Sequence, residues 1–280
     1  MILNPFSYSA PQTIQEAISL LSETGFEVFT GDQAYIGNAK KGISKPAALV
    51  SLRNVPGLKF VINYGDQLEI GSAVSFGAML ADSAVCSVPV LVDALKTIKD
   101  PHLRNHSNVG GALYLNGAAH GPLLAAFLTL NGKVNITGPQ GERQILLETY
   151  LLNGITASLT KGEIIRSVVL TTTNTASGSF HFIDYLKAGK IVCGAAVLVD
   201  KDENTISKIR IAISGCVKVP VRLSALEESL NGKEITKDNI DTALRGLSPD
   251  DLAISNDSIP NPSYLLHLLK VLIKRAVLKS

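Results

Sequence analysis

The chain changes character at residues 173–179, a polar run that follows neither the helical nor the strand period of apolar residues. Its 280 residues are enough for two modest domains, each with a hydrophobic core of its own. We therefore predict an α+β protein with an α/β domain in two parts at residues 1–173 and an α+β domain at residues 178–280.

The first part of the α/β domain is predicted at residues 1–57. Apolar residues at helical spacing fill residues 13–24, where Thr13 and Glu16 form a capping-box pattern. Two strands are predicted after this helix, at residues 26–30 and 48–52. This order is typical of a β-α-β unit.

The second part, residues 58–173, is predicted to form a mixed sheet with helices. Strands are expected at residues 60–62, 68–70, 133–137 and 164–172. Helices are expected at residues 78–84, 90–98 and 122–130.

The second domain is predicted to hold a three-stranded antiparallel sheet packed on helices. The three strands are expected at residues 180–186, 191–199 and 206–213, and the helices at residues 223–230, 237–244 and 262–278. The last helix is apolar around most of its circumference, so we expect it in the core or against another subunit rather than on a membrane.

Composition argues against several classes of function. A net charge of +2, scattered Lys and Arg residues and the lack of Trp disfavour nucleic-acid binding. No apolar run approaches the roughly 18 residues of a membrane span, and the first residues do not resemble a signal peptide. The three cysteines form no C-x-x-C pair. We therefore expect a cytoplasmic protein with reduced thiols.

The segment at residues 100–126 is the most informative for function. Its centre is the pair Gly110-Gly111, preceded by polar residues from Asn105 to Asn108. Adjacent glycines allow a turn through positive φ, and such a turn can present backbone N–H groups to a phosphate. An ordinary tight turn is the alternative interpretation.

This segment resembles a motif of the flavoprotein (medium) subunits of molybdenum hydroxylases, the family of xanthine dehydrogenase-like and carbon monoxide dehydrogenase-like enzymes. The matching residues are Leu103, Arg104, Asn105 and Ser107 to Gly111. The start of the chain is similar to that family at Phe6, Tyr8, Pro11, Thr13, Ile14, Glu16, Ala17, Ile18, Leu20 and Leu21. The C-terminal part is similar at Gly215, Pro220, Arg222, Glu227, Leu230, Gly232 and Lys233.

The resemblance implies that the first domain binds FAD and that the chain transfers electrons within a complex. Electrons would come from iron–sulfur clusters on a small subunit, beyond which lies a molybdopterin large subunit, and would leave to NAD or another acceptor. The implied FAD residues form a first loop, Thr30, Gly31, Asp32, Gln33, Ala34 and Tyr35, and a second, Asn108, Val109, Gly110, Gly111 and Ala112. Gly121, Ile164 and Lys187 complete the implied set.

Some of these residues depart from the family pattern. Asp32 replaces a glycine, and a carboxylate beside a diphosphate would repel it. Asn108 replaces the usual Thr, Ala112 the usual Asn, and Gly121 the usual ribityl-binding Asp. A flavin-free scaffold or assembly subunit of the same family is therefore the alternative, and a nucleotide-binding regulatory domain is a third reading.

Other candidate chemistry is weaker. His102 and His106 have the i, i+4 spacing of helical metal ligands, but no acidic residue or cysteine nearby completes a site, and Pro101 suggests irregular backbone. We expect these histidines to face solvent or stabilise a loop. No nucleophile with its base and no Walker A loop is present, so we expect no catalytic residue on this chain.

Overall fold

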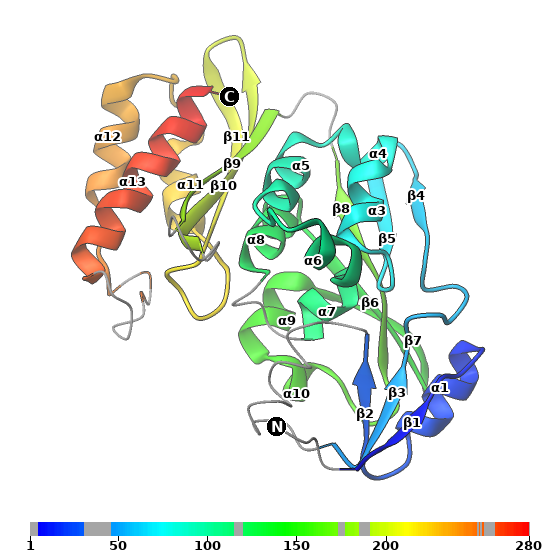
Figure 1. The fold of residues 1–280 in the computed structure, drawn as a ribbon. Coiled ribbons are helices and arrows are strands. Elements are labelled where there is room, and N and C mark those ends of the chain that lie inside the picture. Colours follow the sequence, from blue (N-terminus) through cyan, green and yellow to red (C-terminus); the bar gives the residue numbers. More distant parts are fainter. Residues whose placement is uncertain are drawn as a thin grey trace. The chain divides into compact units, whose positions relative to one another are not determined.

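The computed structural model describes residues 5–30, 46–114, 120–172, 177–184, 191–250, 252, 254 and 261–279. They divide into two compact units, each drawn from several stretches of chain (Figure 1). Unit 1 comprises Met1–Ala84, Asp100–Asn116 and Lys133–Leu170, and unit 2 comprises Val85–Lys99, Gly117–Gly132 and Thr171–Ser280. The boundary predicted between two continuous sequence domains stays a prediction.

Unit 1 begins with a small parallel sheet. Its strands β1 (Ser7–Ser9), β2 (Phe26–Phe29) and β3 (Ala48–Ser51) lie in the order β1-β3-β2. Helix α1 (Ile14–Leu21) connects β1 to β2 and starts as predicted, because Thr13 Oγ1 accepts a hydrogen bond from the Glu16 N–H at 3.1 Å. Strand β1 was not predicted, since it has only three residues and these are largely exposed.

A five-stranded sheet forms the rest of the framework of unit 1. Its strands are β4 (Val61–Asn63), β5 (Gln67–Gly71), β6 (Lys133–Gly138), β7 (Gly141–Leu146) and β8 (Ile164–Thr171), in the order β4-β5-β8-β6-β7. The helices of this part are α3 (Phe76–Ala81), α6 (Pro101–His106), α7 (Val109–Tyr114), α9 (Leu147–Asn153) and α10 (Ile155–Ser158), and the short helix α4 (Ser83–Cys86) includes the sequence boundary between Ala84 and Val85. Strand β7 was missed because most of its side chains are exposed and it lacks an alternating apolar pattern.

Unit 2 contains an antiparallel sheet of four strands, one more than predicted. The strands β9 (Ser177–Asp184), β10 (Ile191–Asp202), β11 (Thr205–Ser214) and β12 (Val221–Arg222) lie in the order β12-β11-β10-β9. The predicted pairing of β10 with β11 is confirmed, with Val197 opposite Ile211. The extra strand β12 has two residues, too few for a periodic pattern.

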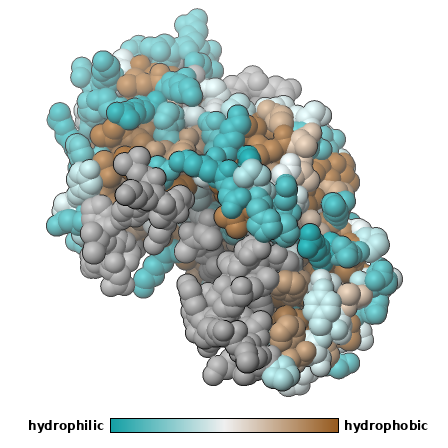
Figure 2. All heavy atoms as spheres, viewed as in Figure 1, coloured by the Kyte–Doolittle hydropathy of each residue, from teal (hydrophilic) through white to brown (hydrophobic). Residues whose placement is uncertain are grey.

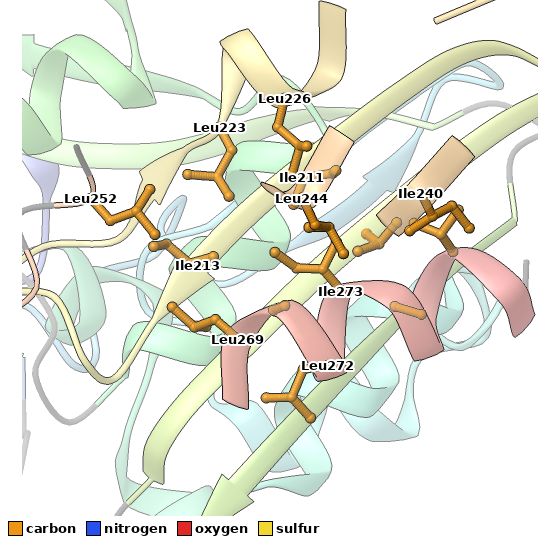
Figure 3. Close-up of a cluster of buried hydrophobic side chains, with 14 of the residues drawn as sticks. Ile211, Ile213, Leu223, Leu226, Ile240, Leu244, Leu252, Leu269, Leu272 and Ile273 are labelled. Atoms are coloured by element: carbon orange, nitrogen blue, oxygen red, sulfur yellow. The ribbon is translucent and has the colours of Figure 1, made fainter. Parts of the chain in front are cut away.

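The two faces of this sheet pack against different helices. The helices are α5 (Pro89–Lys96), α8 (Gly121–Thr129), α11 (Ser224–Leu230), α12 (Lys237–Arg245) and α13 (Pro262–Lys279). Side chains alternate along a strand, so Ile211 and Ile213 point to one face, where they join Leu269 and Ile273 of α13 in one cluster (Figure 3). Helix α8 packs against β10 and β11, and all nine of its residues are buried.

The long C-terminal helix α13 lies in the core, which was one of the two positions predicted for it. Its buried residues are Leu265, Leu266, Leu269, Leu272, Ile273, Ala276 and Val277. Hydrophilic residues cover much of the visible surface of the C-terminal helices, with smaller apolar areas between them (Figure 2). Within the described ranges, no helix is both long enough and apolar enough to cross a membrane.

Candidate functional site

The glycine pair lies in a short helix rather than in a left-handed turn. Gly110 and Gly111 belong to the first turn of α7, and neither has a positive φ. Asn108 caps this helix, because its side-chain Oδ1 accepts a hydrogen bond from the Gly111 N–H at 2.7 Å. The expectation of a turn was wrong because glycine is compatible with either conformation and the cap decides between them.

The backbone N–H groups at the start of α7 donate within the protein. The Val109 N–H donates to Val74 O at 3.2 Å, and the Gly110 N–H donates to Ser72 O at 2.7 Å. The Ala112 N–H donates to Asn108 O at 3.0 Å. With the Gly111 N–H bound to the Asn108 side chain, these groups do not form the phosphate nest that adjacent glycines suggested.

Close packing explains the glycine at position 110. A Cβ added to Gly110 would lie 3.1 Å from Ser72 O, 3.2 Å from Ser72 Cβ and 3.5 Å from Thr30 Cγ2. Real Cβ atoms rarely approach a neighbour so closely, so a side chain at this position would require Ser72 to shift by a few tenths of an ångström. Gly110 thus allows α7 to lie directly against the residue that follows β5 and against Thr30.

Asn108 joins two of the predicted site segments. Its side-chain Nδ2 donates to the carbonyl oxygen of Thr30 at 2.7 Å, and the residue is only 4% exposed. Thr30 directly follows β2 and is the first residue of the first predicted FAD loop. The structure therefore brings Thr30 together with residues 108–112, which sequence spacing alone does not show.

The other end of α7 is also held. The Tyr114 hydroxyl oxygen accepts a hydrogen bond from the Ile165 N–H at 3.1 Å, and the Tyr150 hydroxyl donates to Leu113 O at 3.1 Å. Burial raises the pKa of both phenols, so both stay protonated in neutral solution. Together with Asn108, these tyrosines fix α7 at both ends.

The remaining predicted site residues lie in three different settings. Gly31, Asp32, Gln33, Ala34, Tyr35 and Lys187 lie outside the described residues. Ile164, at the start of β8, is fully buried in the apolar cluster that includes Ala17, Leu21 and Val50. Gly121 is the first residue of α8 in unit 2, where an added Cβ would lie 3.1 Å from Ser214 Cβ.

The paired histidines stand on a helix, which corrects the expectation of irregular backbone. His102 and His106 belong to α6, with ring centroids 4.2 Å apart, and His106 Nδ1 lies 2.9 Å from His102 O. Pro101 does not interrupt this helix because it occupies the first turn, where Asp100 supplies the cap. In the part of the chain that the structure describes, no cluster of three or more His, Cys, Asp or Glu residues is suited to hold a metal.

Residues 108–112 can support a flavin site, but the N–H groups of residues 109–112 are not free to bind its phosphates. The amides of residues 109–112 are already engaged, so donors for a diphosphate have to come from other residues. A helix fixed at both ends, with Gly110 and Asn108 against Thr30, holds the point at which the first predicted loop begins.

Both parts of the chain match known families. Residues 4–171 match the family described as FAD binding domain in molybdopterin dehydrogenase. Residues 190–280 match the family described as CO dehydrogenase flavoprotein C-terminal domain.

Related proteins match over nearly the whole chain. The nicotine 6-hydroxylase medium subunit of Paenarthrobacter nicotinovorans is 27% identical, with 100% of this chain and 99% of that protein covered. The carbon monoxide dehydrogenase medium chain of Hydrogenophaga pseudoflava is 27% identical, with 87% and 86% covered.

Solved structures share the fold. Quinoline 2-oxidoreductase from Pseudomonas putida 86 is 24% identical with a TM-score of 0.90, covering 100% of this chain and 98% of that one. A reconstituted CO dehydrogenase from Oligotropha carboxidovorans is 20% identical with a TM-score of 0.92, covering 99% and 98%.

Proposed function

Because this chain belongs to the FAD-binding family of molybdopterin dehydrogenases and is a medium-type flavoprotein subunit, we propose that it transfers electrons from iron–sulfur clusters of a partner subunit to NAD or another acceptor. The observation that carries this proposal is the presence of both family matches in one chain, which also aligns with a medium subunit over nearly the full length of both proteins.

The composition supports a division of cofactors among subunits. Iron–sulfur clusters are generally held by about four cysteines, and the chain has three, none in a C-x-x-C pair. The cysteine count thus points to a cluster outside this chain, and the family resemblance implies that the clusters lie on a small subunit and the molybdopterin on a large one. The substrate is accordingly chosen outside this chain.

The proposed role of this chain's own residues is to bind and orient the flavin. When bound, FAD supplies the two-electron redox chemistry between the one-electron cluster and the acceptor, while the protein supplies position and electrostatics. On the family resemblance, we propose that the first loop, Gly31 to Tyr35, supplies main-chain donors for the diphosphate and that Asn108, Val109, Gly110, Gly111 and Ala112 support it. Gly121, Ile164 and Lys187 remain proposed members of the flavin environment on the family resemblance.

Coexpression with its partner subunits tests the electron-transfer role. We expect the purified complex to release FAD on denaturation, in a ratio near one per medium subunit, and its flavin absorbance to bleach when NADH is added without oxygen. A complex that holds FAD but is not reduced by NADH would exclude NAD as the acceptor and leave FAD binding intact. A complex without FAD would contradict the proposal.

The flavin-free scaffold is the second candidate, and Asp32, Ala112 and Gly121 are the residues that favour it. If the Asp32 carboxylate faces the diphosphate, repulsion at an effective dielectric near 20 amounts to a few kcal/mol at about 4 Å. A cost of about 3 kcal/mol weakens FAD binding about a hundredfold. Asp32→Gly should then tighten FAD binding, and the gain should shrink with added salt. A colourless wild type whose Asp32→Gly variant also takes up no FAD would mean that the side-chain losses at Ala112 and Gly121 decide FAD binding, and it would favour the scaffold.

A further inference from the structure

We propose that Asn108 is a positioning residue for the flavin site: it couples the cap of α7 to the end of β2 without contacting the phosphates itself. This inference rests on the proposed FAD-binding function. It concerns one side chain whose two polar atoms have different partners, Oδ1 with the Gly111 N–H and Nδ2 with Thr30 O, each at 2.7 Å.

The two bonds assign the orientation of the amide. The Gly111 N–H requires an acceptor and the Thr30 carbonyl requires a donor, so only one of the two possible amide orientations satisfies both. Both bonds are buried. Each polar atom of the side chain therefore has a protein partner, and the two bonds together join the two segments.

No other small side chain reproduces this pair of bonds. Asp offers two acceptors, so Asn108→Asp keeps the helix cap but places a carboxylate oxygen against the Thr30 carbonyl. Asn108→Thr, which introduces the residue usual in the family resemblance, keeps a cap oxygen but is one atom shorter and loses the bridge to Thr30. Asn108→Leu has a similar volume and loses both bonds.

Holding the Thr30 carbonyl matters because a peptide group is planar. The carbonyl and the N–H that follows it belong to one rigid group, so fixing the oxygen limits how the chain can leave Thr30. Thr30 is also close to Gly110, and the Leu52 N–H donates to Phe29 O at 2.9 Å, so the last residues of β2 are held from two sides. Asn108 thereby fixes the carbonyl of Thr30, which is itself a member of the proposed flavin site.

FAD affinity of the full chain in its complex provides the main test. Both Asn108→Asp and Asn108→Thr lose the buried bond to Thr30 O and leave that oxygen without its donor. We therefore expect each variant to raise the Kd for FAD about tenfold to a hundredfold. Both variants keep the α7 cap, so both should fold. The flavin fluorescence and visible circular dichroism of the remaining bound FAD should also change, because the Thr30 carbonyl is no longer fixed.

Asn135→Asp is the matched control. Asn135 Nδ2 donates to Ser167 Oγ at 2.9 Å and to Glu69 Oε1 at 3.2 Å, in the sheet of unit 1 and without contact to Thr30. This variant undergoes the same chemical change and loses stability, but its Kd for FAD should stay within about twofold at temperatures below unfolding. An unchanged Kd in Asn108→Asp and Asn108→Thr would overturn the inference, as would an equal loss of affinity in Asn135→Asp.

Hydrogen exchange separates this inference from the proposed function. Without flavin, the Leu52 amide should exchange faster in Asn108→Asp than in Asn135→Asp, because the end of β2 is released. If the wild type binds no FAD but the two variants still differ in the exchange of the Leu52 amide, the proposed function is refuted and the coupling stands. Equal exchange in the two variants, together with normal FAD binding in wild type, would refute the coupling alone.

Discussion

The N–H of Gly110 donates to the carbonyl oxygen of Ser72 at 2.7 Å, and a Cβ added to Gly110 would lie 3.1 Å from that same oxygen. Close packing against Ser72 therefore favours glycine at one residue of the conspicuous glycine pair. This close contact exists whether or not a ligand lies nearby. A substitution of Gly110 therefore tests packing as well as flavin binding.

Replacing Gly110 should destabilise the folded chain directly. Gly110→Ala introduces a contact with backbone that cannot move freely, and such overpacking costs about 1–3 kcal/mol in the free energy of unfolding. Gly110→Val should cost more and should lower flavin content through misfolding. Urea unfolding of the flavin-free chain measures this effect.

The double variant Ser72→Gly with Gly110→Ala serves as its control. It removes the contact with Ser72 Cβ, at 3.2 Å, but leaves the contact with the carbonyl oxygen. The second substitution should therefore restore only part of the loss. A Gly110→Ala protein as stable as wild type would contradict the packing explanation.

Most of the fold follows from local sequence patterns. Helix α1 begins where Thr13 and Glu16 place the cap, and the strands β10 and β11 pair as their apolar runs predict. The strands β1 and β12 were not predicted because they have only three and two residues. Such short strands are defined by pairing with a neighbouring strand and not by their composition.

The arrangement around the glycine pair depends on contacts distant in sequence. Asn108 meets Thr30, which lies 78 positions away, and Gly110 meets Ser72. The family resemblance could select residues 108–112 but could not tell whether their N–H groups face a ligand or the protein. Asn is a common N-cap residue, and Asn108 lies three residues before Gly111 and accepts a hydrogen bond from its N–H. This local pattern indicates a helix start, but the two glycines favoured a turn instead.

Gly121 and Ser214 should be coupled in unit 2. Gly121→Ala would place its Cβ 3.1 Å from Ser214 Cβ, so we expect a loss of about 1–2 kcal/mol, and Ser214→Gly should relieve it. Ser214 is fully buried, and its Oγ has no hydrogen-bond partner among the described residues. Ser214→Ala alone should therefore be neutral or stabilising by up to about 1 kcal/mol. Thermal unfolding of wild type, Gly121→Ala, Ser214→Gly and the double variant measures the coupling, and additive effects would disprove it.

Arg222 and Glu227, two residues of the C-terminal resemblance, form a half-buried pair that should stabilise unit 2. Arg222 Nε and Nη2 donate to the two Glu227 oxygens at 2.9 and 2.8 Å, and Nη1 donates to Asn131 Oδ1 at 2.9 Å. Glu227→Gln leaves the guanidinium without its charge partner and should cost about 2–4 kcal/mol.

The double variant Arg222→Met with Glu227→Leu should recover part of that loss. Recovery should be incomplete because Glu227 Oε1 also accepts the Ile211 N–H at 2.8 Å. Chemical denaturation of the single and double variants measures both effects. A Glu227→Gln protein with wild-type stability would show that the pair contributes nothing.

The Arg143–Glu163 pair should make the free energy of unfolding depend on pH in the acidic range. Arg143 Nε and Nη2 donate to the two carboxylate oxygens of Glu163, each at 2.7 Å, and the Thr160 N–H donates to Oε2 at 2.7 Å. The guanidinium first, and the backbone N–H with it, lower the pKa of Glu163 from 4.5 to about 2. The stabilisation is therefore fully present above pH 4.5 and is lost as the pH falls toward 2.

Comparison with Glu163→Gln isolates this contribution from those of other carboxylates. The Arg143 side chain is 39% exposed, so solvent screening reduces the expected difference in the free energy of unfolding to about 1–2 kcal/mol at neutral pH. The difference should shrink steadily below pH 4.5. Glu142→Gln is the control, because Glu142 pairs with Arg166 at 3.6 Å with its side chain 66% exposed, and it should change stability by less than about 0.5 kcal/mol. A difference between wild type and Glu163→Gln that does not vary with pH would mean that the ion pair does not hold this carboxylate ionised.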